Sequence, residues 1–178
     1  LGSLDSVRAA AATIAAAHPT VDILMNNAGL MAMPERRTAD GFEMQLGVNH
    51  FGHWVLTAEL LEALLAAEAA RVVTVTSTAH HMGRRVDPRN PHMGRPIDLD
   101  DVDLEGSYSP WSAYGRAKLA NYHFGLGLDR EFRARDLAAE SLVAHPGLSH
   151  TDLQVRTHAE GGAGTSGAVA QWMAAKTG

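Results

Sequence analysis

The sequence predicts an α/β protein whose parallel β-sheet is covered by helices on both faces. The first observation is that three short apolar segments, residues 21–25, 71–77 and 140–145, alternate with stretches of helical periodicity. Strands that alternate with helices form parallel sheets, because each helix carries the chain back across the sheet. The second observation is that polar residues or glycines follow each strand. Ligands bind beyond the carboxyl ends of such strands, so this edge is the expected site.

The composition is that of one globular domain. Of its 178 residues, 46% are hydrophobic and 20% are charged, and the formal net charge is −5. The negative charge argues against nucleic-acid and anionic-membrane partners, and no apolar run of about 20 residues is present to span a bilayer. The absence of cysteine excludes disulfides and fits a cytoplasmic protein. Arginine outnumbers lysine by 13 to 2, from which we predict a bacterial source.

The first part of the chain is expected to form a helix and then a buried strand. Residues 3–17 are alanine-rich and amphipathic, which favours a helix. The strand of residues 21–25 is broken by the segment 26–29, Asn-Asn-Ala-Gly, and residues 30–37 are expected to form a loop.

A long helix and a second strand come next. Thr38 or Asp40 is expected to cap this helix, which continues to about Ala67. The segment 71–77 is β-branched and mostly apolar, so we expect a strand covered on both faces.

A long segment without periodicity, residues 78–109, separates that strand from the next helix, and loops of this length are usually functional. The next helix is expected after Pro110 and extends to about Arg135. The third strand ends at Pro146-Gly147. The remaining residues are predicted as an unassigned segment at 148–160, a flexible glycine-rich segment at 161–167 and a short last helix.

Tyr114 and Lys118 form the most informative pair in the sequence. They lie four residues apart in a predicted helix, so both face the same side. A free phenol has a pKa of about 10, and a neighbouring ammonium lowers it, which would make the tyrosine a usable general acid or base. The alternative is a surface helix with an unrelated tyrosine and lysine. Lysine is rare in this chain, which favours the functional interpretation.

Asn49 interrupts an otherwise apolar helical segment, Val48 to Trp54, which also contains a glycine. One interpretation is a packing contact between small residues. The other is a polar group beside the site, with Asn49 or its carbonyl holding a water.

Three other motifs are weaker. The segment 162–167 matches G-x-G-x-x-G, but it lacks the preceding strand and following βαβ unit of a dinucleotide loop. His50 and His53 lie near one helical face without a third ligand, and His80 and His81 are adjacent, so no metal site is predicted. No G-x-S-x-G elbow supports a serine hydrolase.

Several motifs, in order, resemble the short-chain dehydrogenase/reductase family. The segment 26–29 is similar to the family's N-N-A-G, and Asn49 to its catalytic asparagine. Ser77, at the end of the second strand, resembles the catalytic serine, with Thr76 and Thr78 as alternatives. Tyr114 and Lys118 match the Y-x-x-x-K pair. The segment 145–151 resembles the P-G segment beside the cofactor. The amino-acid sequence around these motifs is most similar to that of the retinol-dehydrogenase-like branch.

The resemblance implies an oxidoreductase that transfers a hydride between a nicotinamide cofactor, NADP slightly ahead of NAD, and a small alcohol or carbonyl substrate. Tyr114 would exchange a proton with the substrate oxygen, and Ser77 would hydrogen-bond that oxygen. Lys118 would lower the pKa of Tyr114 and bind the ribose, and Asn49 would position a relaying water. The implied catalytic residues are Asn49, Ser77, Tyr114 and Lys118, and the implied cofactor-binding residues are Asn26, Ala28, Gly29, Tyr114, Lys118, Pro146, Gly147, Leu148 and Thr151.

The resemblance also implies a Rossmann-type, doubly wound sheet in three α/β/α layers. Residues 1–178 would be a single incomplete domain, because the family's phosphate-binding loop, first strands and last strand have no counterpart here. Residues 78–109 would be an insertion. A catalytically inactive partial domain, or a non-enzymatic relative that keeps the fold, remains the alternative.

Overall fold

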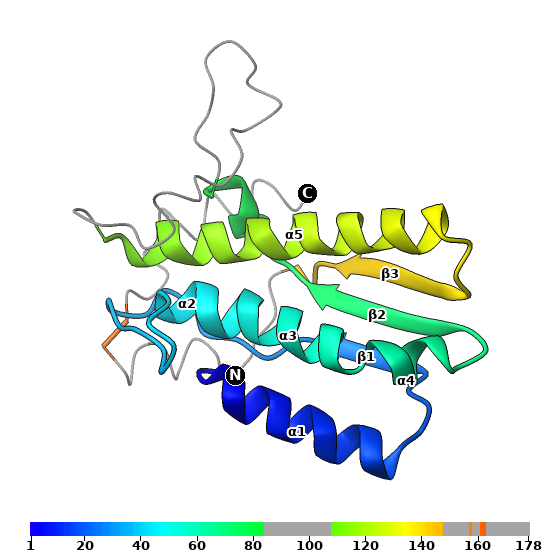
Figure 1. The fold of residues 1–178 in the computed structure, drawn as a ribbon. Helices are drawn as coiled ribbons and strands as arrows, with labels where there is room; N and C mark the ends of the chain where they lie inside the picture. The colour runs from blue at the N-terminus through cyan, green and yellow to red at the C-terminus, as the bar shows by residue number, and fades with distance from the viewer. Residues whose placement is uncertain (84–107, 148–156, 158–160, 163–178) are drawn as a thin grey trace.

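The computed structural model describes residues 1–83, 108–147, 157 and 161–162. Its centre is a parallel three-stranded sheet in the order β1 (Ile23–Asn26), β2 (Ala70–Val75) and β3 (Ala139–Ala144) (Figure 1). Asn26 is paired with Thr74, and Thr74 with Val143, so the strands end at nearly the same level. The predicted α/β class and its parallel sheet are confirmed. Each observed strand lies within about two residues of its predicted position.

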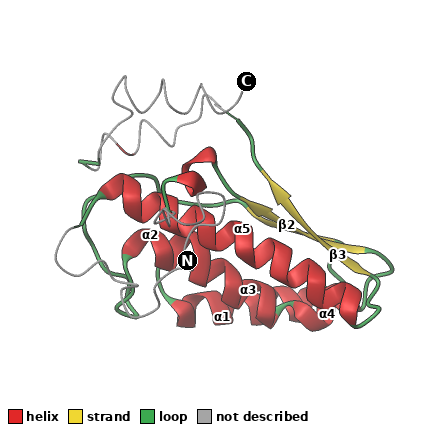
Figure 2. Cartoon of the chain, turned by 90° about the horizontal axis from the view of Figure 1, so that it is seen from above, coloured by secondary structure: helices red, strands yellow, loops and turns green. Residues whose placement is uncertain are grey.

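The described helices lie on one face of the sheet. Figure 2 shows α1 (Leu4–Ala17), α3 (Gly52–Glu59), α4 (Leu61–Leu65) and α5 (Pro110–Ala134) on the same side of the strands. The reason is topological. Both connections between strands step in the same direction, and right-handed crossovers then place their helices on one face. On the other face, the side chains of Ile23, Met25 and Leu142 are exposed. The helices expected on that second face are not among the described residues.

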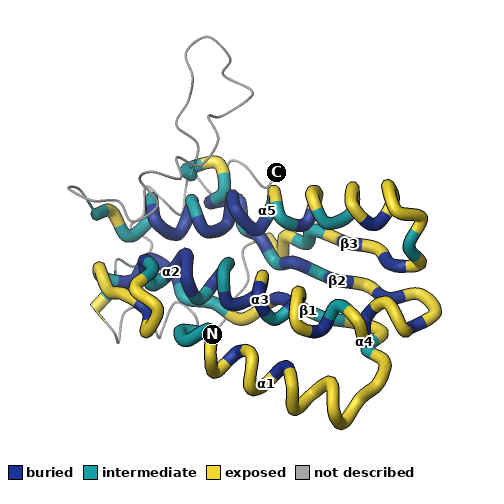
Figure 3. Tube along the Cα trace, viewed as in Figure 1, coloured by how far each residue is buried: buried dark blue, intermediate teal, exposed yellow. Residues whose placement is uncertain are grey.

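The core fills the space between the sheet and the helices. In Figure 3 the faces of α3 and α5 that meet the sheet are buried, whereas most of α1 is exposed. One apolar cluster contains Leu60 from the break between α3 and α4, Leu64 from α4, Val72 from the central strand and Phe132 from α5. Burying one such side chain stabilises the fold by about 1.5–3 kcal/mol. This cluster fixes α5 against β2 and thereby positions the site residues that α5 carries.

Thr38 and Asp40 were the predicted N-caps of the second helix, and this prediction is wrong. Glu43 is the observed N-cap, and its carboxylate accepts hydrogen bonds from the Gln45 and Leu46 amides at the start of α2 (Met44–Leu46). Asp40 instead accepts a hydrogen bond of 2.9 Å from the Leu4 amide at the start of α1. Thr38 closes a turn by accepting from the Phe42 amide. The contact between Asp40 and α1 is long-range, so local sequence could not indicate it.

The expected long helix is also interrupted. A π-helical turn, η1 (Gly47–Phe51), separates α2 from α3, and Leu60 breaks the helix again before α4. Asn49 lies inside this π-helical turn. Such turns are rare and occur often at functional sites, because they displace main-chain carbonyls from the regular helical pattern.

The remaining predictions have mixed outcomes. The helix over residues 110–135 is confirmed as α5. The segment after β2 begins with a short 3₁₀ turn, η2 (Thr78–His81), and residues 84–107 lie outside the described part of the chain. Most of the region after Gly147, including the last predicted helix, lies outside it too. Among the helices that are described, none combines the length and the apolar character needed to cross a membrane.

Candidate active site

The candidate site lies at the carboxyl edge of the sheet, where α5 packs against the turn that follows β2. Gly115 makes this close approach possible, because a Cβ at its position would lie 2.7 Å from the Ala79 carbonyl oxygen and 2.8 Å from the Gly83 amide. The preceding residue, Tyr114, is 5% exposed and packs edge-on against Trp111. The start of α5 thus buries the predicted proton donor against the end of β2.

A side-chain hydrogen bond joins Tyr114 to Ser77. Ser77 follows β2 and also caps η2, where its Oγ accepts a hydrogen bond of 3.2 Å from the Ala79 amide. Burial raises the pKa of Tyr114 to about 12, and the hydrogen bond to Ser77 offsets part of this rise. The phenol is therefore protonated at neutral pH and can act as a donor.

Lys118 is on the same face of α5 as Tyr114, one turn further along the helix. Its Nζ atom is 5.7 Å from the centroid of the Tyr114 ring and donates a 3.1 Å hydrogen bond to the Val75 carbonyl. Burial lowers the pKa of Lys118 to about 8, because an ammonium loses hydration there. The expected lowering of the Tyr114 pKa by Lys118 is not found. The ammonium lies over the ring, and burial is the dominant effect on the phenol.

Asn49 is fully buried, and its side chain binds the loop after β1. Its Oδ1 accepts a 2.7 Å hydrogen bond from the Leu30 amide, and its Nδ2 donates a 2.8 Å hydrogen bond to the Leu30 carbonyl. Gly29 is needed beside it, because a Cβ there would lie 2.9 Å from Asn49 Oδ1. The side-chain amide is therefore occupied, and the Asn49 carbonyl is also hydrogen-bonded, to His53 Nδ1 at 2.9 Å. A carbonyl oxygen has a second lone pair, and the prediction that Asn49 holds a water rests on it.

The predicted cofactor-binding residues differ in accessibility. Asn26 is 1% exposed, and its Nδ2 donates a 3.0 Å hydrogen bond to Thr57, which ties β1 to α3. Ala28, by contrast, is exposed. Pro146 and Gly147 are also exposed, immediately after β3. Leu148 and Thr151 lie outside the described residues, and the cofactor-binding roles of the whole set stay predictions.

Two polar residues next to Lys118 were not singled out as site residues by the sequence. Asn121 Nδ2 donates a 3.2 Å hydrogen bond to the same Val75 carbonyl, and Asn121 Oδ1 is 3.1 Å from His50 Nδ1. The sequence analysis weighed His50 only as a metal ligand and set that role aside because no third ligand is near it. Among the described residues, no group of three or more side chains that could hold a metal ion is found. The available signal was the position of Asn121, one turn after Lys118 on the same helix face.

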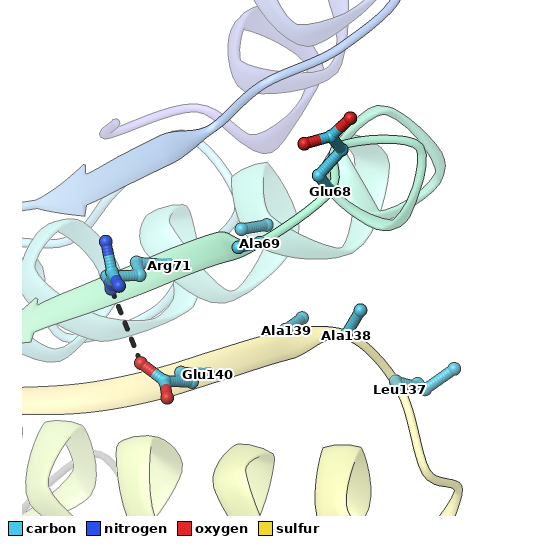
Figure 4. A pocket seen from close by; sticks show the side chains of 8 residues that line it. Glu68, Ala69, Arg71, Leu137, Ala138, Ala139 and Glu140 are labelled. Atoms are coloured by element: carbon cyan, nitrogen blue, oxygen red, sulfur yellow. Dashed lines mark hydrogen bonds and ion pairs between the residues drawn. The ribbon is translucent and has the colours of Figure 1, made fainter.

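A shallow pocket lies at the opposite edge of the sheet. It surrounds the starts of β2 and β3 and is lined largely by alanines, with the Arg71–Glu140 ion pair at its side (Figure 4). The two ion-pair atoms are 3.3 Å apart, and both side chains are more than half exposed. This pocket contains none of the predicted site residues.

Lys118 is the side chain at the carboxyl edge that could hold the ribose of a nicotinamide cofactor. Lys118 has three N–H donors, and in the described part of the chain one of them is used, by Val75. The others are available for hydroxyl oxygens such as those of a sugar. Exposed residues at the ends of β1 and β3 border the same edge.

The fold and the site together are those of a parallel α/β protein with a buried tyrosine and lysine beyond its central strand. A family model described as short chain dehydrogenase matches residues 1–88. Short-chain dehydrogenase/reductase prx1 of Penicillium roqueforti is 39% identical over 158 residues, which is 86% of this chain and 42% of that protein. Human retinol dehydrogenase 13 is 39% identical over 162 residues, or 90% of this chain and 45% of that protein. The chain belongs to the short-chain dehydrogenase/reductase family.

Solved structures share the fold. An uncharacterised protein from Mycobacterium paratuberculosis has a TM-score of 0.68 and 39% identity, with 98% of this chain and 55% of that chain covered. A short chain dehydrogenase from Burkholderia cenocepacia, solved in complex with NADP, shares the fold with a TM-score of 0.59 and 23% identity, over 85% of this chain and 52% of that one. The chain spans less than half the length of the curated relatives named above.

Proposed function

We propose that this chain carries the catalytic residues of an NAD(P)-dependent oxidoreductase that interconverts an alcohol and a carbonyl. The observation that carries the proposal is the trio of Ser77, Tyr114 and Lys118, in which Tyr114 and Lys118 are buried and Ser77 is partly buried. Tyr114 is hydrogen-bonded to Ser77 and covered by the Lys118 ammonium. These side chains meet at the sheet edge where α/β proteins bind ligands.

Each residue has a distinct task in this proposal. Tyr114, whose pKa is raised to about 12, holds the proton that passes to a carbonyl oxygen or returns from an alcohol. Ser77 donates a hydrogen bond to the same oxygen. The Asn49 carbonyl, in the π-helical turn, holds a water that relays the proton. A cation beside the phenol stabilises the phenolate that forms during transfer.

The cofactor would be held by Lys118 at its ribose, with Ala28, Gly29, Pro146 and Gly147 along the edge and, by resemblance, Asn26, Leu148 and Thr151. When bound, a nicotinamide cofactor supplies the hydride. NADP is proposed slightly ahead of NAD, with support from the structural neighbour solved with NADP. The substrate is proposed as a small alcohol or carbonyl compound, and the retinol dehydrogenases among the relatives make an apolar alcohol a suitable first choice. A cytoplasmic location stays a prediction.

A cofactor and substrate screen of the full-length protein tests the proposal. NADPH and NADH are each mixed with a panel of aldehydes and ketones, NADP⁺ and NAD⁺ with the matching alcohols, and absorbance at the reduced-nicotinamide band is followed. We expect turnover with at least one pair and none after Ser77→Ala and Tyr114→Phe are combined. Turnover that is equal in the double variant would contradict the proposal.

A further inference from the structure

The Val75 carbonyl is a shared acceptor at the end of the central strand. β1 pairs with β2 as far as Asn26 and Thr74, and the Thr76 amide is bonded to Ala144 on the other side. The Val75 carbonyl instead accepts two side-chain donors, Lys118 Nζ at 3.1 Å and Asn121 Nδ2 at 3.2 Å. A carbonyl oxygen has two lone pairs, so these donors together saturate it.

Both the oxygen and the nitrogen of the Asn121 side-chain amide have hydrogen-bond partners. The residue is 1% exposed, and its Oδ1 lies 3.1 Å from His50 Nδ1 in the π-helical turn. His50 in turn packs edge-on against Phe124, one turn along α5 from Asn121. Burial lowers the pKa of His50, so the ring is neutral and offers one N–H. With that proton on Nδ1, His50 donates to Asn121 Oδ1, which directs the amide Nδ2 toward Val75.

We infer that Asn121, oriented by His50, is a positioning residue for the Lys118 ammonium. The inference rests on the proposed function, in which Lys118 acts on Tyr114 and the cofactor. By occupying one lone pair of the Val75 carbonyl, Asn121 confines Lys118 to the other. It also links Lys118 to the π-helical turn that carries Asn49. In the part of the chain that the structure describes, the titratable groups facing Lys118 are Tyr114 on α5 and His53 on α3, with His50 behind Asn121.

Two substitutions separate positioning from simple structural support. Asn121→Leu removes both hydrogen bonds, so kcat/KM for the cofactor should fall about 10-fold or more, because the ammonium is no longer confined. Asn121→Asp keeps the shape but places a carboxylate beside Lys118. An opposite charge favours the ammonium, so the alkaline limb of the kcat profile should move to higher pH. A purely structural role would lower stability without moving that limb.

The matched control is Thr74→Val. Thr74 precedes Val75 on β2, is equally buried, and its hydroxyl has no hydrogen-bond partner in the described part of the chain. This variant should leave the cofactor KM and the pH profile unchanged. If Asn121→Leu does not fold, His50→Phe replaces it, since this variant keeps a ring and loses Nδ1. It should change the same constants in the same direction.

A readout independent of catalysis keeps this inference distinct from the proposed function. The pKa of Lys118 can be followed by NMR with isotope-labelled lysine in the full-length protein, with the Lys118 signal assigned by its loss in Lys118→Met. Asn121→Asp should raise that pKa above the wild-type value by one unit or more. An unchanged pKa of Lys118, or an unchanged alkaline limb in an active enzyme, would overturn the inference. A wild type without turnover in the screen would instead overturn the proposed function alone.

Discussion

Ser77 and Tyr114 are hydrogen-bonded across the junction between β2 and α5. They are distant in sequence, and they meet because α5 packs against the turn Thr78–His81 that Ser77 caps. Burial keeps the phenol protonated and the hydrogen bond keeps it oriented. The Lys118 ammonium lies over the Tyr114 ring, 5.7 Å from its centroid.

Lys118→Arg should weaken cofactor binding and move the activity optimum to higher pH. Lys118 is 5% exposed and directs a compact ammonium at the Val75 carbonyl, whereas a guanidinium is larger and planar. The lysine pKa is lowered to about 8, so its charge is lost above that pH, but arginine stays charged. Cofactor titration and a pH–rate profile measure both effects.

Arg71→Lys is the control for this substitution, because Arg71 is exposed at the opposite edge of the sheet. Arg71→Lys should change neither the cofactor affinity nor the pH–rate profile. If Lys118→Arg also leaves the cofactor affinity and the profile unchanged, Lys118 has no part in the site.

The free energy of unfolding should vary with pH in the alkaline range and reach its maximum near pH 10. Lys118 has a folded pKa of about 8, below its ordinary 10.5, so the unfolded chain binds more protons in that window. The free energy of unfolding therefore rises with pH between these values. Tyr114 acts oppositely, because its folded pKa of about 12 exceeds the ordinary 10.0, and its contribution is lost as pH rises through that range.

Thermal unfolding of the wild type and of Lys118→Met from pH 7 to 11 tests this dependence. The variant should be more stable at pH 7, and its advantage should shrink as pH rises to 10. A constant difference between the two proteins across the range would show that Lys118 keeps an ordinary pKa in the folded state.

Gly115→Ala should destabilise the fold by about 1–3 kcal/mol, because the new methyl group meets backbone atoms that cannot rotate away. The nearest are the Ala79 oxygen at 2.7 Å and the Gly83 nitrogen at 2.8 Å. Gly127 is the matched control on the same helix, since a Cβ there has nothing within 4 Å. Gly127→Ala should stabilise by about 0.5–1 kcal/mol through helix propensity. Urea unfolding of both variants compares them, and equal effects would contradict the close packing of α5.

Much of the fold was predictable because its signals are local. Pro110 and the helix-favouring residues after it define α5, and the β-branched run defines β2. Parallel strands end at the same edge of the sheet. Ser77, which follows β2, lies at this edge, and so does the start of α5. Tyr114 and Lys118 were found because their spacing matches the helical period.

The rest depends on contacts between distant residues. The π-helical turn at Asn49 and the cap at Glu43 have no local signature, and the bond between Asp40 and α1 is long-range. The direction of the Tyr114 pKa shift was predicted from the adjacent charge alone. It is set instead by burial, which packing determines. The role of His50 beside Asn121 likewise appears once the two helices are packed together.

The central claim is that Tyr114 is the proton donor of a nicotinamide-dependent reaction. Its most direct test is the single-turnover rate of hydride transfer, followed at the reduced-nicotinamide band, for full-length wild type and Tyr114→Phe with the same substrate. The account predicts a fall of roughly 10²–10⁴-fold with the fold intact, because only a hydroxyl is lost. A Tyr114→Phe protein that transfers hydride at the wild-type rate would contradict it.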